Sequence, residues 1–486
     1  MPVPAPSPKP NARVQGQFLA RRSVLCALWP LFLFCLVGLS LLALSGPAVA
    51  EGQEGAPSAA AGGGEADVPP VPGGFAVRAI AQGARELLEG LVGFPRPGDA
   101  GPPNPLTLPP EGPLEIILRH SIPRALAGKA CSARIMAVGD ILIHNTMRQY
   151  AANGDGGFDF KPNFQYVRPI LAQGDLVIGN LENPLAGADR GLSGYPNFNA
   201  PQELAGDLKA NGFTTVLLSN NHSLDRGWNG LETTIRTVDG AGLDYAGAYL
   251  DGKDKERRLI SVFNGLRIAI LAYTYGLNGY PGPKAGEEWR LGVIDRELIF
   301  SDLRLAWDQG ADFVIVSLHF GNEYQRSPDK LQIRLVQELL AGDPPQGLKG
   351  PDLILGSHPH VVQPFVQTET GPDGASQAVM YSLGNFMTSQ PYAYTYLGLI
   401  LDGHLTLEAD GRKTIGPFTL IPTYCRKGVE DGRKFYRVIP MAQAAGRPAD
   451  FGLSEDEAMQ MAKDLEEINR HLVSLEPEPG RWPNLK

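Results

Sequence analysis

The sequence has no surplus of basic charge. Its 486 residues include 43 lysines and arginines against 52 aspartates and glutamates, which gives a formal net charge of -9. This balance provides no basic footprint for nucleic acid, so a polyanionic partner would need a local basic cleft or a bound cation. Hydrophobic residues make up 43% of the chain and charged residues 20%, which excludes bulk disorder and indicates a globular protein.

The sequence also lacks a phosphate-binding loop of the P-loop type and an apparent internal repeat, and it contains few cysteines. The chain has no Gly-x-x-x-x-Gly-Lys-[Ser/Thr] loop, which argues against an ATP-driven ligase. Beyond an apolar N-terminal segment the sequence contains two cysteines, Cys131 and Cys425. In an oxidising compartment they either pair as a disulfide that closes the region between them or remain two free thiols.

The first fifty residues differ in composition from the rest of the chain. Arg21 and Arg22 precede about two dozen mostly apolar residues, and Ala-Val-Ala at 48–50 offers a small-x-small cleavage site. We predict an export signal at 1–50, although the apolar run is also long enough for an uncleaved membrane anchor. Residues 51–130 are rich in Gly, Ala and Pro and predict a flexible linker with one short helix. The expected location of the protein is the periplasm or cell envelope.

From residue 131 onward, short apolar runs alternate with segments of helical period. The runs are rich in Val, Ile and Leu, have the length of strands, and nearly all end in Gly, Asn, Asp or His. Such alternation predicts an α/β core in which helices cover the faces of buried sheets. We assign 131–425 to this domain and 426–486 to a C-terminal extension with a helix.

Two local signals mark the C-terminal part of the chain. Asp410 and Gly411 lie between two strand-like runs and predict a β-hairpin turn. Ser454 is followed three residues later by Glu457, a capping-box pattern that predicts the start of the final helix.

Polar residues gather where the apolar runs end. Because ligands of open α/β sheets bind outside the carboxyl ends of the strands, these side chains are expected to lie together. Imidazole and carboxylate groups are the ligands that Zn, Mn or Fe sites use. The group comprises Asp140, His144, Glu182, Asn220, Asn221, His222, Asp225, His319, Glu323, His358 and His360.

Several of these residues also have a structural interpretation. Asp140 is as well placed to accept hydrogen bonds from the first turn of a helix as to bind a metal, and Asn221 has the position of a helix cap. A lone histidine after an apolar run, such as His319, is more often a hydrogen-bonded core residue. His358 and His360 differ, because residues two apart in an extended segment point the same way. Two neutral imidazoles at one place favour a metal or an anion.

The order of these motifs resembles that of a known family. Asp140 is followed by "NLE", "NNHSLDRG", "HFGNEY", "GSHPH" and "YSLGNF", all within about 131–390. This order resembles the bacterial capsule synthesis protein CapA family, which is associated with poly-gamma-glutamate biosynthesis and is similar to the calcineurin-like metallophosphoesterases. The resemblance implies an α/β layered sandwich of two mostly parallel or mixed sheets, flanked by helices, with metal-ligand loops at the strand ends.

The resemblance also implies roles for individual residues. The metallophosphoesterase series is an Asp-x-His, a Gly-Asp, an Asn-His, a lone His and a Gly-His-x-His, each at a strand end. By position, the implied metal ligands are Asp140, Glu182, Asn221, His319, His358 and His360. They would hold two divalent cations (Mn, Fe or Zn), with Glu182 as the bridging carboxylate. His222 would donate a hydrogen bond or proton to a leaving oxygen, held in place by Asp225.

This sequence departs from the family pattern at two positions. Ile141 and Leu142 follow Asp140 where an Asp-x-His is expected, and the nearest histidine is His144. Glu182 replaces an aspartate and so adds a methylene to the implied bridging carboxylate. These changes predict weaker or altered metal binding, or a single metal.

Aromatic residues near the motifs have two interpretations. Tyr195, Phe198, Tyr324 and Tyr381 either line a substrate groove or pack beneath the loops, and packing is the expected role.

The resemblance implies an exported protein of capsule or envelope-polymer biosynthesis. One interpretation is a metal-dependent hydrolase of phosphoester, amide or ester bonds. The alternative is a non-catalytic component that binds the polymer or helps its export. The expected partners are an anionic envelope polymer such as poly-gamma-glutamate, membrane-bound capsule synthesis subunits, and the membrane itself if the N-terminal segment is uncleaved. Nucleic acid is not an expected partner.

Overall fold

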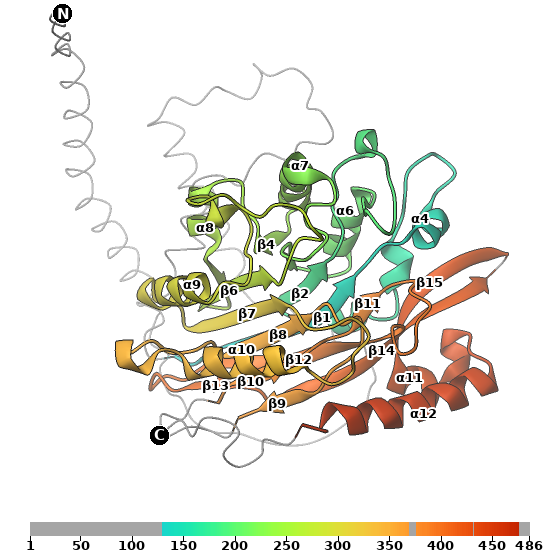
Figure 1. Ribbon diagram of the computed structural model, residues 1–486. Helices are drawn as coiled ribbons and strands as arrows, with labels where there is room; N and C mark the ends of the chain where they lie inside the picture. Colours follow the sequence, from blue (N-terminus) through green and yellow to red (C-terminus); the bar gives the residue numbers. More distant parts are fainter. Residues whose placement is uncertain (1–128, 369–375, 431, 476–486) are drawn as a thin grey trace, which may run out of the picture. The chain divides into compact units, whose positions relative to one another are not determined.

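The computed structural model of this chain describes residues 129–368, 376–430 and 432–475 (Figure 1). The predicted export signal at 1–50 lies outside the described residues, as does the predicted linker at 51–130 apart from its last two positions. None of the helices within the described ranges has the length and apolarity that a membrane span requires.

A nine-stranded mixed sheet forms one layer of the described region. Its main path runs β15 (Arg433–Pro440), β14 (Thr419–Glu430), β12 (Leu397–Leu407), β1 (Cys131–Ile141), β2 (Leu176–Leu181), β3 (Thr215–Leu217) and β4 (Asp244–Ala246). Two short strands join this path, with β11 (Asn385–Met387) beside β1 and β13 (Lys413–Ile415) beside β12. The strands from β1 to β4 are parallel, whereas β1, β12, β14 and β15 pair antiparallel in succession.

A six-stranded mixed sheet forms the second layer. Its order is β5 (Ile260–Phe263), β6 (Leu266–Thr274), β7 (Phe313–His319), β8 (Leu353–Ser357), β10 (Ala378–Met380) and β9 (Phe365–Gln367). The central strands from β6 to β10 are parallel, and the two edge strands pair antiparallel. The parallel strands are the Val-, Ile- and Leu-rich runs of the sequence, because both of their faces are covered.

Alternate residues of the two sheets share one apolar core. Ile135 and Ala137 of β1 pack in the same buried cluster as Ile268 of β6 and Leu355 of β8. Met136, between the two β1 residues, packs in a different cluster on the opposite face, as the two-residue period of a strand requires. The two sheets therefore face each other, and the predicted layered α/β sandwich with two mixed sheets is confirmed.

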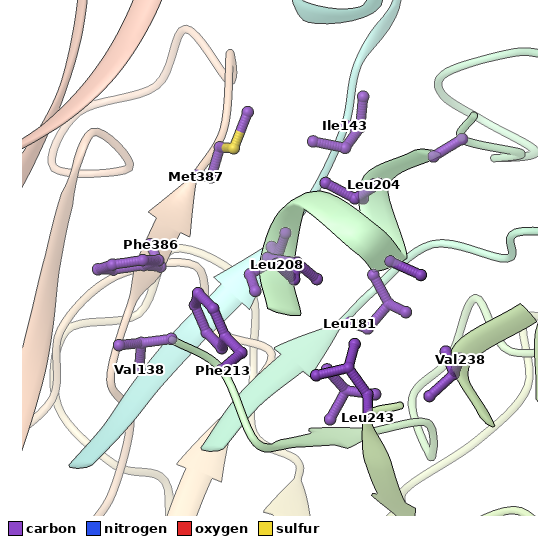
Figure 2. Packing of buried hydrophobic residues seen from close by; sticks show 14 of the residues in the cluster. Val138, Ile143, Leu181, Leu204, Leu208, Phe213, Val238, Leu243, Phe386 and Met387 are labelled. Carbon is purple, nitrogen blue, oxygen red and sulfur yellow. The ribbon is translucent and has the colours of Figure 1, made fainter. Parts of the chain in front are cut away.

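Helices cover the outer faces of both sheets (Figure 1). Residues of α6 (Glu203–Ala210) and α7 (Gly227–Gly240) pack on the first sheet, in one buried cluster with Val138 of β1 and Leu181 of β2. Figure 2 shows part of this cluster, with Val238 of α7 near Leu243. Residues of α9 (Arg296–Asp308) and α10 (Lys330–Ala341) pack on β7 and β8 of the second. The other helices are α4 (Asn145–Ala151), α5 (Arg168–Leu171), α8 (Gly252–Arg258), α11 (Met441–Gly446), α12 (Glu455–Leu472) and the short 3-10 helices η1 (Lys161–Phe164), η2 (Ala188–Arg190), η3 (Glu288–Arg290), η4 (Pro344–Gln346) and η5 (Pro448–Phe451).

The local signals of the C-terminal part are present in the structure. Gly411 has a φ of 85° in the turn between β12 and β13, which confirms the predicted hairpin. The Ser454 side chain accepts from the Glu457 N–H, and the Glu457 side chain accepts from the Ser454 N–H, which confirms the predicted cap of α12.

The C-terminal segment belongs to the same folded unit. The boundary expected after residue 425 falls within β14, and the following β15 completes the first sheet. Met461 and Ile468 of α12 pack in the core between the sheets. The segment is part of the sandwich because β15 pairs antiparallel with β14, from Thr423 with Pro440 to Glu430 with Arg433.

The two cysteines of the described region are free, so the disulfide hypothesis is wrong. Cys131 pairs with Leu407 at one end of β12, whereas the Cys425 N–H donates to the Tyr396 carbonyl beside the other end. β12 contains 11 residues. At about 3.3 Å per residue they separate the cysteines by roughly 30 Å, far beyond the ~6 Å Cα spacing of a disulfide.

Substitution of Phe386 tests the packing beneath the first sheet (Figure 2). Its fully buried ring lies 6.0 Å from the Phe164 ring and 6.2 Å from the Phe213 ring, measured between centroids. We expect Phe386→Ala to lower the free energy of unfolding by about 3–5 kcal/mol, because it leaves a cavity among rigid neighbours. Urea unfolding followed by circular dichroism measures this loss.

Leu331→Ala is the matched control for this substitution. Leu331 lies on α10 and is 77% exposed, so its truncation is expected to change stability by less than about 0.5 kcal/mol. A similar small change for Phe386→Ala would contradict the packing described here.

Candidate metal centre

The carboxyl ends of strands from both sheets bring the predicted site residues together. Asp140 lies near the end of β1, Glu182 directly follows β2, and His319 is the last residue of β7. His358 and His360 follow β8. All five side chains are buried, with at most 3% of each residue exposed.

One group of potential ligands lies around His319. Its Nε2 is 3.5 Å from Oε1 of Glu182 and 2.9 Å from Oδ1 of Asn221. The His358 ring centroid is 4.9 Å from that of His319. Ligand atoms of Glu182, His319 and His358 all lie within 4.8 Å of one another.

A second group lies around Asp140. His360 Nδ1 is 3.2 Å from Oδ2 of Asp140, and its Nε2 is 3.9 Å from Oε1 of Glu182. Ligand atoms of Asp140, Glu182 and His360 also lie within 4.8 Å of one another. Glu182 therefore belongs to both groups.

The environment of Glu182 is unusual for a buried carboxylate. In the described part of the chain, no donor makes a hydrogen bond to either of its oxygens, and Nδ1 of His358 is also buried without a partner. Burial and the nearby Asp140 carboxylate raise the pKa of Glu182 well above its usual range. An uncompensated carboxylate is costly in a protein interior. A cation at this place would compensate it.

The surrounding imidazoles are held in their neutral form. Burial lowers the pKa of His358 to about 3, and burial also lowers the pKa of His319 well below its usual range. A neutral imidazole keeps a lone pair that can bind a metal. The donor set of carboxylate oxygens, imidazole nitrogens and the Asn221 amide oxygen fits a divalent transition-metal ion.

Asp140, unlike Glu182, accepts hydrogen bonds from neighbouring groups. Its Oδ1 accepts a hydrogen bond from the Asn180 amide at 2.7 Å, and its Oδ2 accepts from the His358 N–H at 3.4 Å. Oδ2 also faces Nδ1 of His360. A cation bound here would share Asp140 with these donors.

The position expected to carry the histidine of an Asp-x-His does not contribute to the site. Leu142 is 1% exposed, and its N–H donates to the Met387 carbonyl. His144 belongs to neither of the two groups found in the described residues. Its ring packs edge-to-face on Phe198, and burial lowers its pKa to about 4.

His222 and Asp225 form a buried pair. His222 Nδ1 lies 2.8 Å from Oδ2 of Asp225, which also accepts from the Phe198 N–H at 2.7 Å. The loop that carries them is fixed to β2, because the Asn220 amide donates to the Leu181 carbonyl at 2.9 Å. Asn221 lies in this loop, and α7 begins only at Gly227, so its interpretation as a helix cap is wrong.

The backbone at the paired histidines is not extended. His358 has a φ of 97° and His360 a φ of 58°, both in the left-handed region that L-residues seldom adopt. The prediction that His358 and His360 converge because they lie two apart in an extended segment is therefore wrong. They reach the same place through a tight turn after β8, and such strained positions cluster at functional sites.

Three supporting side chains were not identified from the sequence. Asn180 Nδ2 lies 3.3 Å from His319 Nδ1 as well as donating to Asp140, and Ser357 Oγ is 2.9 Å from the same nitrogen. Asn385 Oδ1 lies 3.1 Å from His360 Nδ1. Each lies within one of the quoted motifs, "NLE", "GSHPH" and "YSLGNF", which is the signal that could have identified it. Their hydrogen bonds orient the imidazole rings.

The aromatic residues near the motifs divide into two kinds. Phe198 and Tyr381 are buried, which confirms the expected packing role. Tyr195 is 73% exposed and Tyr324 is 38% exposed, so that expectation is wrong for them. Glu323 is also exposed and is in neither group formed by the described residues, although its charge acts on Glu182.

The fold and these groups define a layered α/β protein with a carboxylate-imidazole cluster at its strand ends. The family model described as "Bacterial capsule synthesis protein PGA_cap" matches residues 134–390, more than half of the chain. The chain belongs to this family, which confirms the predicted resemblance.

Two relatives carry the family's name. The "Capsule biosynthesis protein CapA" of Bacillus anthracis is 30% identical over 278 residues, covering 55% of this chain and 62% of the relative. The "PGA biosynthesis protein CapA" of Bacillus subtilis (strain 168) is 30% identical over 266 residues, covering 53% and 64%. The chain thus matches less than two thirds of the length of each relative.

Two solved structures align with a large part of this chain at low sequence identity. The NAD nucleotidase of Haemophilus influenzae aligns with a TM-score of 0.37 and 13% identity, covering 70% of this chain and 56% of that one. The calcineurin-like phosphoesterase YfkN of Bacillus subtilis aligns with a TM-score of 0.33 and 14% identity, covering 70% and 98%.

Replacement of Glu182 in chelator-treated protein tests its electrostatic environment. The raised pKa means that the proton on Glu182 stabilises the fold fully below the unfolded value of 4.5, and this stabilisation is lost as the pH rises. Glutamine stays neutral at every pH. We expect metal-free Glu182→Gln to exceed metal-free wild type in unfolding free energy by about 1–3 kcal/mol at pH 7, and to match it near pH 4.

Urea unfolding at both pH values measures this difference. Glu338→Gln, a surface change on α10, serves as the control and should show no such pH dependence. Equal stability of wild type and Glu182→Gln at pH 7 would show that the carboxylate is compensated without a cation.

Proposed function

We propose that this protein is a metal-dependent hydrolase of capsule or envelope-polymer biosynthesis. The observation that carries the proposal is the buried cluster around Glu182, where among the described residues no donor bonds to the carboxylate and where burial keeps His319 and His358 neutral. Membership of the capsule synthesis family supports the process. The bond attacked is a phosphoester, or an amide or ester bond of the polymer.

The residues that would hold the metal are the two overlapping groups. Glu182 with His319, His358 and Asn221 forms one, and Glu182 with Asp140 and His360 forms the other. The two groups would hold two divalent cations, Mn, Fe or Zn, and Glu182 would belong to both sites. When bound, such cations supply Lewis acidity, which lowers the pKa of a water and offsets negative charge that develops on the substrate.

The chain's own side chains have separate tasks in this proposal. Asp225 accepts from Nδ1 of His222, which orients the ring. In the imidazolium form Nε2 also carries a proton, which it would donate to a leaving oxygen, leaving the neutral ring bound to Asp225 through Nδ1. Asn180 and Ser357 hold the His319 ring in place through Nδ1. The low exposure of these side chains limits the access of bulk water.

A second candidate function is binding of the polymer without catalysis. Asp140 is engaged by Asn180 and His360, and Leu142 stands where a further histidine ligand is expected, both of which favour a weaker second metal position. A protein with one cation in this cluster would bind an anionic polymer during its synthesis or export.

Location and partners form part of the same proposal. We place the protein in the periplasm or cell envelope, anchored by its N-terminal segment or released after cleavage. An anionic polymer such as poly-gamma-glutamate is the proposed partner, since bound cations would supply the attraction that the net charge of -9 does not. Membrane-bound capsule synthesis subunits are the proposed protein partners.

Metal content provides the first test of this function. We expect purified protein to contain Mn, Fe or Zn, and chelated protein to take up ~2 divalent ions per chain in calorimetric titration. Glu182→Gln should weaken uptake at both positions, and Asn180→Ala should weaken it about 10–100-fold by releasing the ligands it orients. Glu338→Gln is the control. Absence of metal in the isolated protein together with no uptake on titration would remove the mechanism.

Turnover by His222 variants separates catalysis from binding. With added Mn, wild type is expected to hydrolyse a phosphodiester or poly-gamma-glutamate, and His222→Ala should lower kcat by about 10²–10⁴-fold through loss of the proton donor. His404→Ala, a histidine on β12 outside both groups found in the described residues, should have no effect. Equal rates for wild type and His222→Ala would favour the binding function.

A further inference from the structure

One face of the C-terminal helix α12 contacts the loops around the metal cluster. Glu467 and His471 lie four residues apart near the end of α12, so their side chains share a face of the helix. Both residues are half-buried, whereas Ile468 and Leu472 beside them pack in the apolar core. The family match ends at residue 390, so α12 lies outside the matched segment.

Arg326 connects this face to the loop that follows β7. Its Nη1 forms an ion pair with Oε1 of Glu467, and its carbonyl accepts from Nε2 of His471 at 3.0 Å. The guanidinium carbon of Arg326 also lies 4.1 Å from the centroid of the Tyr394 ring. Two residues of α12 therefore hold both the side chain and the backbone of Arg326.

The loop that contains Arg326 supports the turn of the paired histidines. The Tyr324 N–H donates at 2.8 Å to the carbonyl of Pro359, which lies between His358 and His360. The Tyr324 ring is 6.1 Å from the His360 ring, between centroids. Both histidines have a positive φ. Because such a backbone persists only where its surroundings fix it, the turn depends on bonds of this kind.

His471 also contacts the segment that follows this turn. The backbone of Val362 is a second hydrogen-bond partner of the His471 ring. Val362 lies two residues after His360 and forms a β-bridge with Leu383. One side chain of α12 thus joins the loop after β7 to the segment directly after His360.

The loop between β11 and β12 provides a third connection. Tyr394 of this loop forms a hydrogen bond with the Glu467 side chain. Asn385, the first residue of β11, donates through Nδ2 to the Thr395 carbonyl at 2.9 Å. Its Oδ1 lies 3.1 Å from Nδ1 of His360. The loop that bonds to α12 is therefore also bonded to the amide that orients His360.

We propose that the Glu467–His471 face of α12 is a positioning element of the metal site, which keeps His360 in place as a ligand. Each of the three segments described above connects this face to the neighbourhood of His360. The inference rests on the proposed function, because it takes His360 to be a metal ligand.

The exposure of the ion pair indicates that this effect is local. The Arg326 side chain is 25% exposed and the Glu467 side chain 39% exposed. Ion pairs with this access to water contribute little to global stability. Removing the contacts of this face should therefore loosen the loops around His360 and leave the rest of the sandwich folded.

Amide hydrogen exchange in chelator-treated protein tests this element without metal. We expect the double variant Glu467→Gln with His471→Ala to exchange the Tyr324 amide about 2- to 10-fold faster, because the lost hydrogen bonds ease local opening. Amides of β3 in the first sheet should exchange as in wild type. The matched control is Glu466→Gln with Asn469→Ala, two exposed positions of the same helix, which should change neither rate.

Metal affinity separates positioning from a purely structural role. In calorimetric titration with Mn²⁺, the double variant is expected to bind about 3- to 10-fold more weakly than wild type, a smaller loss than that of a direct partner of a ligand. The control variant should bind as wild type does. A helix that only stabilises the fold would lower the midpoint of urea unfolding and leave the affinity of the folded protein unchanged.

Two results would overturn the positioning role of α12. One is a Tyr324 amide that exchanges at the wild-type rate in the double variant. The other is a double variant that binds Mn²⁺ as tightly as wild type. Failure of wild type to take up any metal is a different result, which would overturn the proposed function and with it the ligand role of His360.

Discussion

The buried carboxylate of Glu182 is the constraint on which the arrangement of the site depends. It lies near the imidazoles of His319 and His360, which lie at or after the ends of strands of the second sheet, and the described residues provide no hydrogen bond to its oxygens. The fold positions it directly after β2, where the carboxyl ends of parallel strands from two layers converge. A charge that the protein itself leaves uncompensated requires something from outside, and the same burial that makes it costly keeps the neighbouring histidines neutral. The pKa shifts of Glu182 and the neighbouring histidines follow from this one placement, and so does the metal binding that we propose.

Most of the sandwich could be predicted from the sequence. The apolar runs at 131–141, 266–274 and 313–319 are strands covered on both faces, so composition alone indicates them. Helical periodicity likewise predicted the segments that became α6, α7, α9 and α10. The position of β14 and β15 in the first sheet could not be predicted, because their order beside β12 depends on long-range pairing. Their sequence has the ordinary alternation of an antiparallel strand pair.

The sequence predicts which residues form the site better than it predicts how they are arranged. Strand ends identify which residues gather, since parallel strands share one carboxyl edge. They do not reveal that His358 and His360 follow a left-handed turn, that Asp140 is engaged by Asn180, or that Leu142 is buried in the core. Each of these depends on side-chain contacts between segments far apart in the chain. The disulfide hypothesis is wrong for the same reason. The positions of Cys131 and Cys425 near the two ends of the domain sequence do not reveal that they lie at opposite ends of β12.

The continuous sheet formed by β1 and its C-terminal partners bears on how the protein can be divided. The match to the family ends at residue 390, yet β1 pairs with β12 from Cys131 with Leu407 to Val138 with Ile400. A chain shortened to the matched segment would leave β1, the strand that carries Asp140, without its antiparallel partner β12. An exposed, apolar central strand of this kind is prone to pair with other molecules. The segment after residue 390 therefore covers the backbone of β1 and protects the strand that carries Asp140 from aggregation.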